Sequence, residues 1–298
     1  MHDHEWMAEQ FEGQRSHLNA VAYRMLGSRS EADDAVQEAW LRVSRADADA
    51  VENLGGWLTT IVARVCLNML RSRRTRREEP LEEPELVRVP DPLVSPAERH
   101  DPEQAALLAD SVGLALLVVL ETLGPAERLA FVLHDLFGMP FDEIAPIVDR
   151  SPAATRQLAS RARRRVRGAA PAPDPDLARQ RVVVDAFFAA SRDGDFDALV
   201  AVLDPDVVLR TDGGADRRGA TVVVHGADQV AGRARTYARL SAEVHPALVN
   251  GAAGVVVVSA GRPFSIMGFT VADGRIVAID ALTDPARLAQ LDLTAFGV

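Results

Sequence analysis

The segment at residues 151–168 reads SPAATRQLASRARRRVRG and carries the strongest structural signal in the chain. Ser151 is a favoured N-cap residue, and a proline after it suits the first helical turn. Gly168, followed by a proline-rich run, is expected to end the helix. The residues that recur at helical spacing as an inward stripe are Thr155, Leu158, Ala159, Ala162 and Val166. The sequence therefore predicts a helix with one buried face and one polar, arginine-rich face.

The polar face of this predicted helix suits contact with DNA. Arginine can pair with guanine edges and glutamine with adenine, while arginines further along a helix meet phosphates. An alternative is a solvated face, which runs of charge usually form. The candidate DNA-binding residues are Arg156, Gln157, Ser160, Arg161, Arg163 and Arg164.

The segment before this helix favours DNA recognition over the solvated alternative. A helix is predicted over 124–136, Gly-Met-Pro at 138–140 breaks it, and a short helix follows over 141–148. An Asp-Arg turn at 149–150 leads into the basic helix. A short helix, a tight turn and a basic helix form the helix-turn-helix pattern.

Length and charge indicate several domains that contact DNA at limited places. The 298 residues are many for one core, and 48% hydrophobic with 26% charged residues is ordinary for a globular protein. The formal net charge of −10 argues against nucleic-acid binding over the whole surface. All 33 basic residues are arginines, concentrated at 71–77 and 156–167. This asymmetry predicts two DNA-contacting regions.

Cellular location and cofactors follow from what the sequence lacks. No basic-then-apolar leader opens the chain and no apolar run reaches membrane-spanning length, so we expect a cytoplasmic protein without membrane contact. The single cysteine, Cys66, excludes an internal disulfide and a cysteine zinc site. It is expected to be a buried, inert thiol. We expect no cofactor and no metal.

Helices are predicted over 1–27, over 31–43 with Ser30 as N-cap, and from Trp57 to residue 77. The second has an acidic outer face, for which a solvated surface is the alternative. A loop of small residues at 46–56 precedes Trp57. Such a loop beside a basic helix can hold unstacked bases. Arg64 and Asn68 lie four apart on one face of that helix.

Proline-rich stretches separate the remaining parts. Residues 78–102 are an acidic, Pro-rich linker expected to be extended, 103–122 an apolar helix packed on the helix-turn-helix pair, and 169–176 a second linker. Beyond them, helices at 177–192, 195–203 and 227–239 combine with strands at 206–211, 221–224, 243–250, 254–260, 264–271 and 275–281. Asn250-Gly251 and Asp273-Gly274 are hairpin signals. The pattern predicts an α+β half-barrel with a cone-shaped cavity.

This order of elements resembles the extracytoplasmic-function (ECF) sigma factors of bacterial RNA polymerase over residues 5–168. The stretches that carry the resemblance are 31–40, 56–58 and 144–165. The C-terminal part resembles the SnoaL/NTF2 fold, which is appended to one such subgroup. The implied fold class is two all-α sigma domains, the second a helix-turn-helix domain, followed by the α+β half-barrel. The implied domains are 1–77 (sigma region 2), 78–102 (linker), 103–168 (sigma region 4), 169–176 (linker) and 177–298 (SnoaL/NTF2-like regulatory domain).

The resemblance implies roles for residues of the two sigma domains. The core polymerase would bind through the clamp of its largest subunit and the flap of its second subunit, and the basic helix at 152–167 would read the −35 promoter element. The residues implied in clamp binding are Asp33, Asp34, Gln37, Glu38 and Trp40. The loop 50–54 would hold a flipped base of the −10 element, and Arg76 and Arg77 would follow phosphates. The residues implied in −10 recognition are Asn53, Trp57, Arg64, Asn68, Arg71, Arg73 and Arg74.

The resemblance also implies regulation by the C-terminal domain. The subgroup carries an Asp-Gly-Gly motif, matched here at 212–214, and an Asn-Pro-Asp-Lys-Leu-like motif, loosely matched at 283–288. The linker 78–102 would thread toward the polymerase active-site channel. We hypothesise that the C-terminal domain sets how readily the sigma domains engage polymerase. The candidate regulatory residues are Asp212, Gly213, Gly214, Asp284, Pro285 and Leu288.

Other classes of function remain open on the sequence alone. One is a helix-turn-helix regulator that acts without polymerase and carries a ligand-sensing domain. Another is a cyclase- or hydrolase-like enzyme fused to a DNA-binding module, because the cone-shaped cavity could hold a small molecule. Asp204-Pro205-Asp206 and 212–214 nevertheless suit turns, and we expect no catalytic residues. The acid–base candidates for that enzyme are Asp204, Asp206, Asp212, His225, His245 and Asp280.

Overall fold

A computed structural model describes residues 2–45, 53–77, 88–97, 113–169, 173–237 and 242–298. The chain divides into two compact units. The first comprises Met1–Glu82 and Val119–Ala169, and the second comprises Glu83–Val118 and Ala170–Val298. The unit boundary therefore falls inside helix α5 (Leu114–Glu121).

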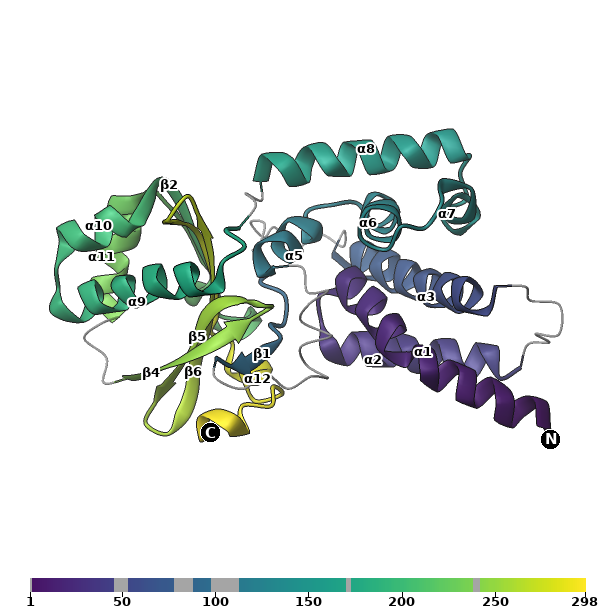
Figure 1. Ribbon diagram of the computed structural model, residues 1–298, viewed down its shortest axis with the longest axis horizontal. Helices are drawn as coiled ribbons and strands as arrows, with labels where there is room; N and C mark the ends of the chain where they lie inside the picture. The colour runs from purple at the N-terminus through teal and green to yellow at the C-terminus, as the bar shows by residue number, and fades with distance from the viewer. Residues whose placement is uncertain (1, 46–52, 78–87, 98–112, 170–172, 238–241) are drawn as a thin grey trace. The chain divides into compact units, whose positions relative to one another are not determined.

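The first unit begins with α1 (His2–Leu26), α2 (Arg29–Val43) and α3 (Leu54–Arg77), which pack on one another (Figure 1). The buried face of α2 carries the alanines Ala32, Ala35 and Ala39, which allow close helix approach. The predicted cap is wrong: Ser28 is the N-cap of α2, and Ser30 lies inside the helix with its hydroxyl 3.1 Å from that of Ser28. The third helix begins at Leu54, so Trp57 lies in its first turn.

The helix-turn-helix of the first unit follows α6 (Pro125–Phe131) and the π-helical turn Val132–Leu136. Its two helices are α7 (Phe141–Val148) and α8 (Pro152–Ala169), joined through Asp149 at φ 56°. The basic helix forms where predicted but continues through Gly168 to Ala169.

The second unit contains a seven-stranded sheet in the order β1-β4-β5-β6-β7-β2-β3. Neighbouring strands are antiparallel except β2 and β7, which are parallel. The strands are β1 (Val94–Pro96), β2 (Leu203–Asp212), β3 (Val222–His225), β4 (Ala242–Val249), β5 (Ala252–Ser259), β6 (Arg262–Ala272) and β7 (Arg275–Leu282). The helical segments are α9 (Leu177–Asp193), α10 (Phe196–Val202), α11 (Ala227–Tyr237), α12 (Pro285–Leu288) and the 3-10 turns Ala215–Ala220 and Thr294–Phe296.

The α+β fold is confirmed, including both predicted hairpin turns. Asn250 and Gly251 have φ values of 50° and 76°, and Asp273 and Gly274 have 51° and 73°. Two successive left-handed residues match the twist of the flanking strands. The predicted turn at Asp204-Pro205-Asp206 is wrong, because both aspartates lie inside β2. The N–H of Asp206 still donates to the Asp204 carboxylate at 2.9 Å, and the strand register shifts beside them.

The sheet has two covered faces (Figure 1). Helices α9, α10 and α11 cover one face, where Phe187, Phe188 and Phe269 pack together in the core. The other face is covered partly by residues that precede the helix-turn-helix in sequence. Val89 is fully buried there, and Leu114 packs with it into the same cluster. The sequence predicts a linker at 78–102, and the structure shows that part of it belongs to the core of the second unit.

Candidate nucleic-acid interface and linker contacts

Helix α8 presents the exposed polar face that the sequence predicts. Ser151 caps it, because its hydroxyl accepts the N–H of Ala154 at 3.2 Å. Thr155, Ala159 and Ala162 are fully buried and fix the rotation of the helix. The candidate DNA-binding residues that are exposed are Arg156, Gln157, Ser160, Arg161 and Arg164.

Two candidate arginines also tie α8 to the preceding helical segments. Arg161 Nε lies 3.2 Å from the carboxylate of Glu127, and Arg163 pairs with Asp135. Arg165 reaches Glu127 as well, at 3.4 Å. Exposed ion pairs of this kind stabilise by about 1 kcal/mol or less, so they orient the arginines without preventing a phosphate contact.

Helix α3 brings Arg64 and Asn68 to one exposed face, as their spacing predicts. Asn53 has a structural contact: its side-chain oxygen accepts the N–H of Gly56 at 3.0 Å, which caps the start of α3. Trp57 is half-buried in the first turn. Residues 46–52, which contain most of the predicted base-holding loop, lie outside the described residues.

The basic end of α3 does not present all its arginines to solvent. Arg71 and Arg74 are exposed. Arg73 instead pairs with Glu31 of α2 and donates to the carbonyl of Leu26 at 3.2 Å. Its side chain is 17% exposed. Arg73 thus links the helices of the first unit, a role that sequence spacing does not indicate.

The acidic face of α2 forms as predicted. The exposed residues on this face are Asp33, Asp34, Gln37 and Glu38. Glu38 pairs with Arg42 at 3.0 Å. Trp40 differs from the other predicted polymerase contacts because it is half-buried, with its ring centroid 5.1 Å from that of Phe11. It supports the packing of α2 on α1.

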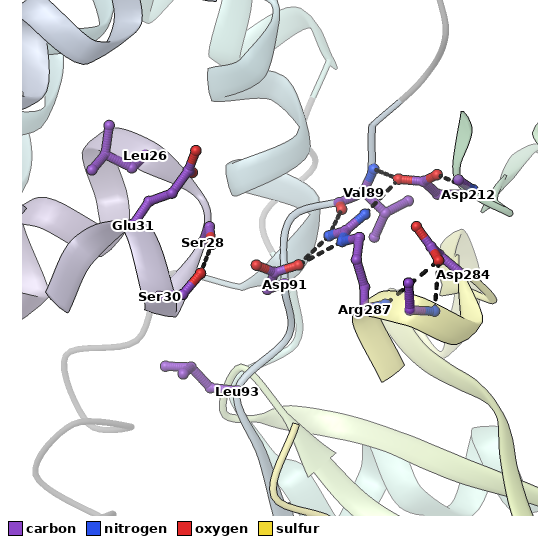
Figure 2. Close-up of polar contacts among 12 residues, drawn as sticks. Leu26, Ser28, Ser30, Glu31, Val89, Asp91, Leu93, Asp212, Asp284 and Arg287 are labelled. Carbon is purple, nitrogen blue, oxygen red and sulfur yellow. Dashed lines mark hydrogen bonds and ion pairs between the residues drawn. The ribbon is translucent and has the colours of Figure 1, made fainter. Parts of the chain in front are cut away.

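In the second unit, Arg287 joins the two predicted regulatory motifs to the linker. Its Nη1 donates to Asp212 Oδ2 at 2.8 Å, and its Nη2 donates to the carbonyl of Val89 at 2.6 Å. Its Nε donates to Asp91 Oδ1 at 2.7 Å. Figure 2 shows the Arg287 guanidinium between Asp91 and Asp212. Asp212 Oδ2 also accepts the N–H of Val89 at 3.0 Å. We call Asp91, Asp212 and Arg287 the linker clasp.

The predicted regulatory residues support this clasp. Asp284 caps α12 by accepting the N–H of Ala286 at 2.9 Å, and this helix carries Arg287. Gly214 has φ 79°, and a Cβ there would lie 2.3 Å from the Asp284 carboxylate. A side chain at position 214 would therefore displace the Asp284 carboxylate from the start of α12. Pro285 is the first residue of α12, and Leu288 is buried beneath it.

The linker is held by backbone pairing as well. Strand β1 pairs with β4 through Val94–Val249, Ser95–Leu248 and Pro96–Ala247. Beside it, Asn250 donates its N–H to the Leu93 carbonyl at 2.8 Å and accepts the Leu93 N–H at 3.1 Å. Sequence reasoning missed Asp91 and Arg287. Arg287 lies within the motif at 283–288, but its charged partner is 196 residues away and no local pattern identifies it.

The predicted acid–base candidates have separate local partners. Asp280 is buried and accepts from Arg210 at 3.0 Å. Burial raises the pKa of Asp280, and the adjacent Arg210 guanidinium opposes that rise. His225 ends β3, and His245 lies 3.5 Å from the Glu243 carboxylate. Asp212 belongs to the linker clasp. Asp280 and Asp212 are therefore each occupied in an ion pair with an arginine, Arg210 and Arg287 respectively.

The described part of the chain contains neither a metal-ligand cluster nor a membrane-spanning helix. No group of three His, Cys, Asp or Glu side chains there is placed to hold a metal ion. Nor does any helix there combine the length and apolarity that crossing a bilayer requires.

Similar proteins follow the same arrangement. Three families match: Sigma-70 region 2 at residues 11–76, Sigma-70 region 4 at 113–166 and the SnoaL-like domain at 184–279. The ECF RNA polymerase sigma factor SigJ of Mycobacterium tuberculosis is 40% identical over 293 residues, covering 93% of this chain and 92% of that protein. The probable ECF RNA polymerase sigma factor SigI of the same species is 39% identical over 232 residues, covering 76% of this chain and 79% of that protein.

One solved structure agrees over nearly the whole chain. The crystal structure of M. tuberculosis SigJ matches with a TM-score of 0.73 and 33% identity, covering 96% of this chain and 99% of that one. The two sigma regions and the SnoaL-like region thus occur in the same order and in the same fold. The chain belongs to the extracytoplasmic-function family of RNA polymerase sigma factors, and it carries a SnoaL-like domain after its two sigma regions.

Proposed function

We propose that this sigma factor brings core RNA polymerase to promoters through four contacts of its two sigma regions. The acidic face of α2 docks on the clamp of the largest polymerase subunit. The exposed residues of α3, with Arg64 and Asn68 at their centre, contact the −10 element. Helix α8 enters the major groove at the −35 element, while region 4 contacts the flap of the second subunit. The observation that carries this proposal is the exposed face of α8 within a helix-turn-helix, with Arg156, Gln157 and Ser160 near its start.

Reconstituted transcription tests the proposal. The purified chain with core polymerase should initiate at a defined start, and Arg156→Ala should weaken discrimination at one base pair of the −35 element by about 1–3 kcal/mol. Arg179→Ala is the control, because Arg179 is an 81% exposed arginine on α9 of the C-terminal domain. If pull-downs recover no polymerase subunits and the mixture initiates nowhere, the proposal is wrong.

We also propose that the C-terminal domain modulates this activity in cis by holding the linker. The domain boundaries we propose remain those at 77, 102, 168 and 176, with the linker 78–102 threading into the polymerase active-site channel. Residues 89–96 cannot enter that channel while Val89 is buried and β1 is paired to β4. Clasp formation and polymerase engagement therefore compete for the same segment. The support is the set of contacts among Asp91, Asp212 and Arg287.

A further inference from the structure

An aromatic pair lies under the first exposed arginine of α8. The guanidinium carbon of Arg156 lies over the Phe141 ring, 5.3 Å from its centroid. The ring of His134 stacks on Phe141 with centroids 3.8 Å apart and an interplanar angle of 28°. Three segments thus contribute to one stack: His134 from the π-helical turn, Phe141 from the start of α7 and Arg156 from α8.

The lower part of this stack is fixed by the turn between α6 and α7. His134 Nδ1 lies 2.9 Å from the carbonyl of Met139, so that nitrogen carries the proton and donates it. Gly138 supplies the left-handed residue of the turn at φ 69°, and Met139 is buried. The imidazole therefore has a defined orientation, and Phe141, half-buried above it, presents a ring to the exposed Arg156.

We propose that Phe141, backed by His134, is a positioning residue that holds the Arg156 guanidinium in place to read a base pair of the promoter. This rests on the proposed function, in which α8 reads the −35 element. The guanidinium contacts an aromatic ring with its own flat face, whereas it pairs bidentately with guanine through its N–H edge. Stacking also restricts a side chain that otherwise loses much rotamer freedom on binding. The simpler alternative is that Phe141 only packs the helix-turn-helix.

A double-mutant cycle in the full-length holoenzyme separates these roles. Initiation is measured at a mapped promoter and at variants with each −35 base pair replaced. We expect Phe141→Leu to reduce discrimination at one base pair by about two- to fivefold, the effect of a single cation–π contact at an exposed site. That loss should disappear in the Arg156→Ala background. Phe141→Tyr, which keeps the ring, should retain the discrimination.

Phe137→Leu is the matched control, since Phe137 is a half-buried aromatic whose ring centroid lies 4.7 Å from the guanidinium carbon of Arg24 on α1. It should leave the base preference unchanged. Because discrimination is a ratio between two promoters with the same protein, partial unfolding of a variant does not alter it.

Two kinds of result would overturn the proposal. The first is that Phe141→Leu reduces discrimination equally with and without Arg156, or reduces it evenly over all base pairs. Phe141 would then only pack the helix-turn-helix, while α8 still reads DNA. If Arg156→Ala itself has no base-specific effect, the assignment of α8 residues fails and this proposal fails with it.

Discussion

Single buried side chains determine how firmly the first unit is held together. Arg128 is 2% exposed, and each nitrogen of its guanidinium donates to an oxygen of the first unit. Its Nε and Nη2 donate to the carbonyl of Arg24 at 3.2 and 3.1 Å, and its Nη1 donates to Glu121 at 2.7 Å. A residue of region 4 thereby satisfies a carbonyl at the end of α1, in region 2. A buried guanidinium is tolerated only when its donors are paired in this way.

Replacing Arg128 by methionine should lower the free energy of unfolding by roughly 3–5 kcal/mol, because Glu121 and the Arg24 carbonyl lose their partner. Urea denaturation followed by circular dichroism measures the change. The control is Arg15→Ala, which breaks the exposed pair with Glu12 and should cost about 1 kcal/mol or less. Similar losses for the two variants would show that Arg128 is not structurally important.

The reactivity of Cys66 measures how tightly α3 is packed. It is fully buried in α3, and burial raises the pKa of its thiol to about 12. The thiolate is the reactive form, so the native thiol should stay unmodified by a disulfide reagent at pH 8 and react fully in denaturant. Rapid labelling of the native chain would contradict the packing of α3.

At the scale of elements, the position of α12 depends on a glycine in another segment. Gly214 lies where a side chain would meet the Asp284 carboxylate that caps α12, and α12 carries Arg287. The Asp-Gly-Gly motif is therefore a requirement for close packing of a strand end against a helix start.

An alanine in the left-handed conformation costs about 1–2 kcal/mol. Gly214→Ala should destabilise the second unit by more than this, because the methyl group also displaces Asp284. Gly261→Ala is the matched control: Gly261 has φ 67°, and a Cβ there meets nothing within 4 Å. Urea unfolding of both variants gives the comparison. Equal losses of unfolding free energy in the two variants would mean that the close approach of Gly214 to Asp284 does not affect stability.

At the scale of the whole molecule, the segment that joins the two sigma regions in sequence is part of the second unit. Val89 and Leu114 pack in its core, β1 extends its sheet, and Asp91 pairs with Arg287. A strand added at a sheet edge with one ionic contact can be exchanged without unfolding the remainder of the sheet. Under the proposed cis modulation, release of residues 88–97 is the step that separates the held linker from the polymerase-bound linker.

Arg287→Ala should weaken this hold, because Asp91 and Asp212 lose their common cation. We expect faster proteolysis within the linker and higher transcription when the sigma factor is limiting. Arg275→Ala removes the same charge from an exposed position in the β6–β7 hairpin and should change neither. Faster proteolysis without higher transcription would separate linker release from regulation and contradict cis modulation.

The sequence by itself determined the local structure. Helical spacing and caps identified α8, and Asn-Gly and Asp-Gly identified two hairpins, whereas the third hairpin, at Ala260-Gly261, has φ values of 50° and 67° but lacks that signal. Exposed Arg64 and Asn68 were predictable because both lie on one helix. Only the tertiary structure assigned Arg73 to Glu31 and Arg287 to Asp91. Spacing fixes which residues share a face of one element, but the partner of a charge from a distant segment depends on how the chain folds back, which no local pattern encodes.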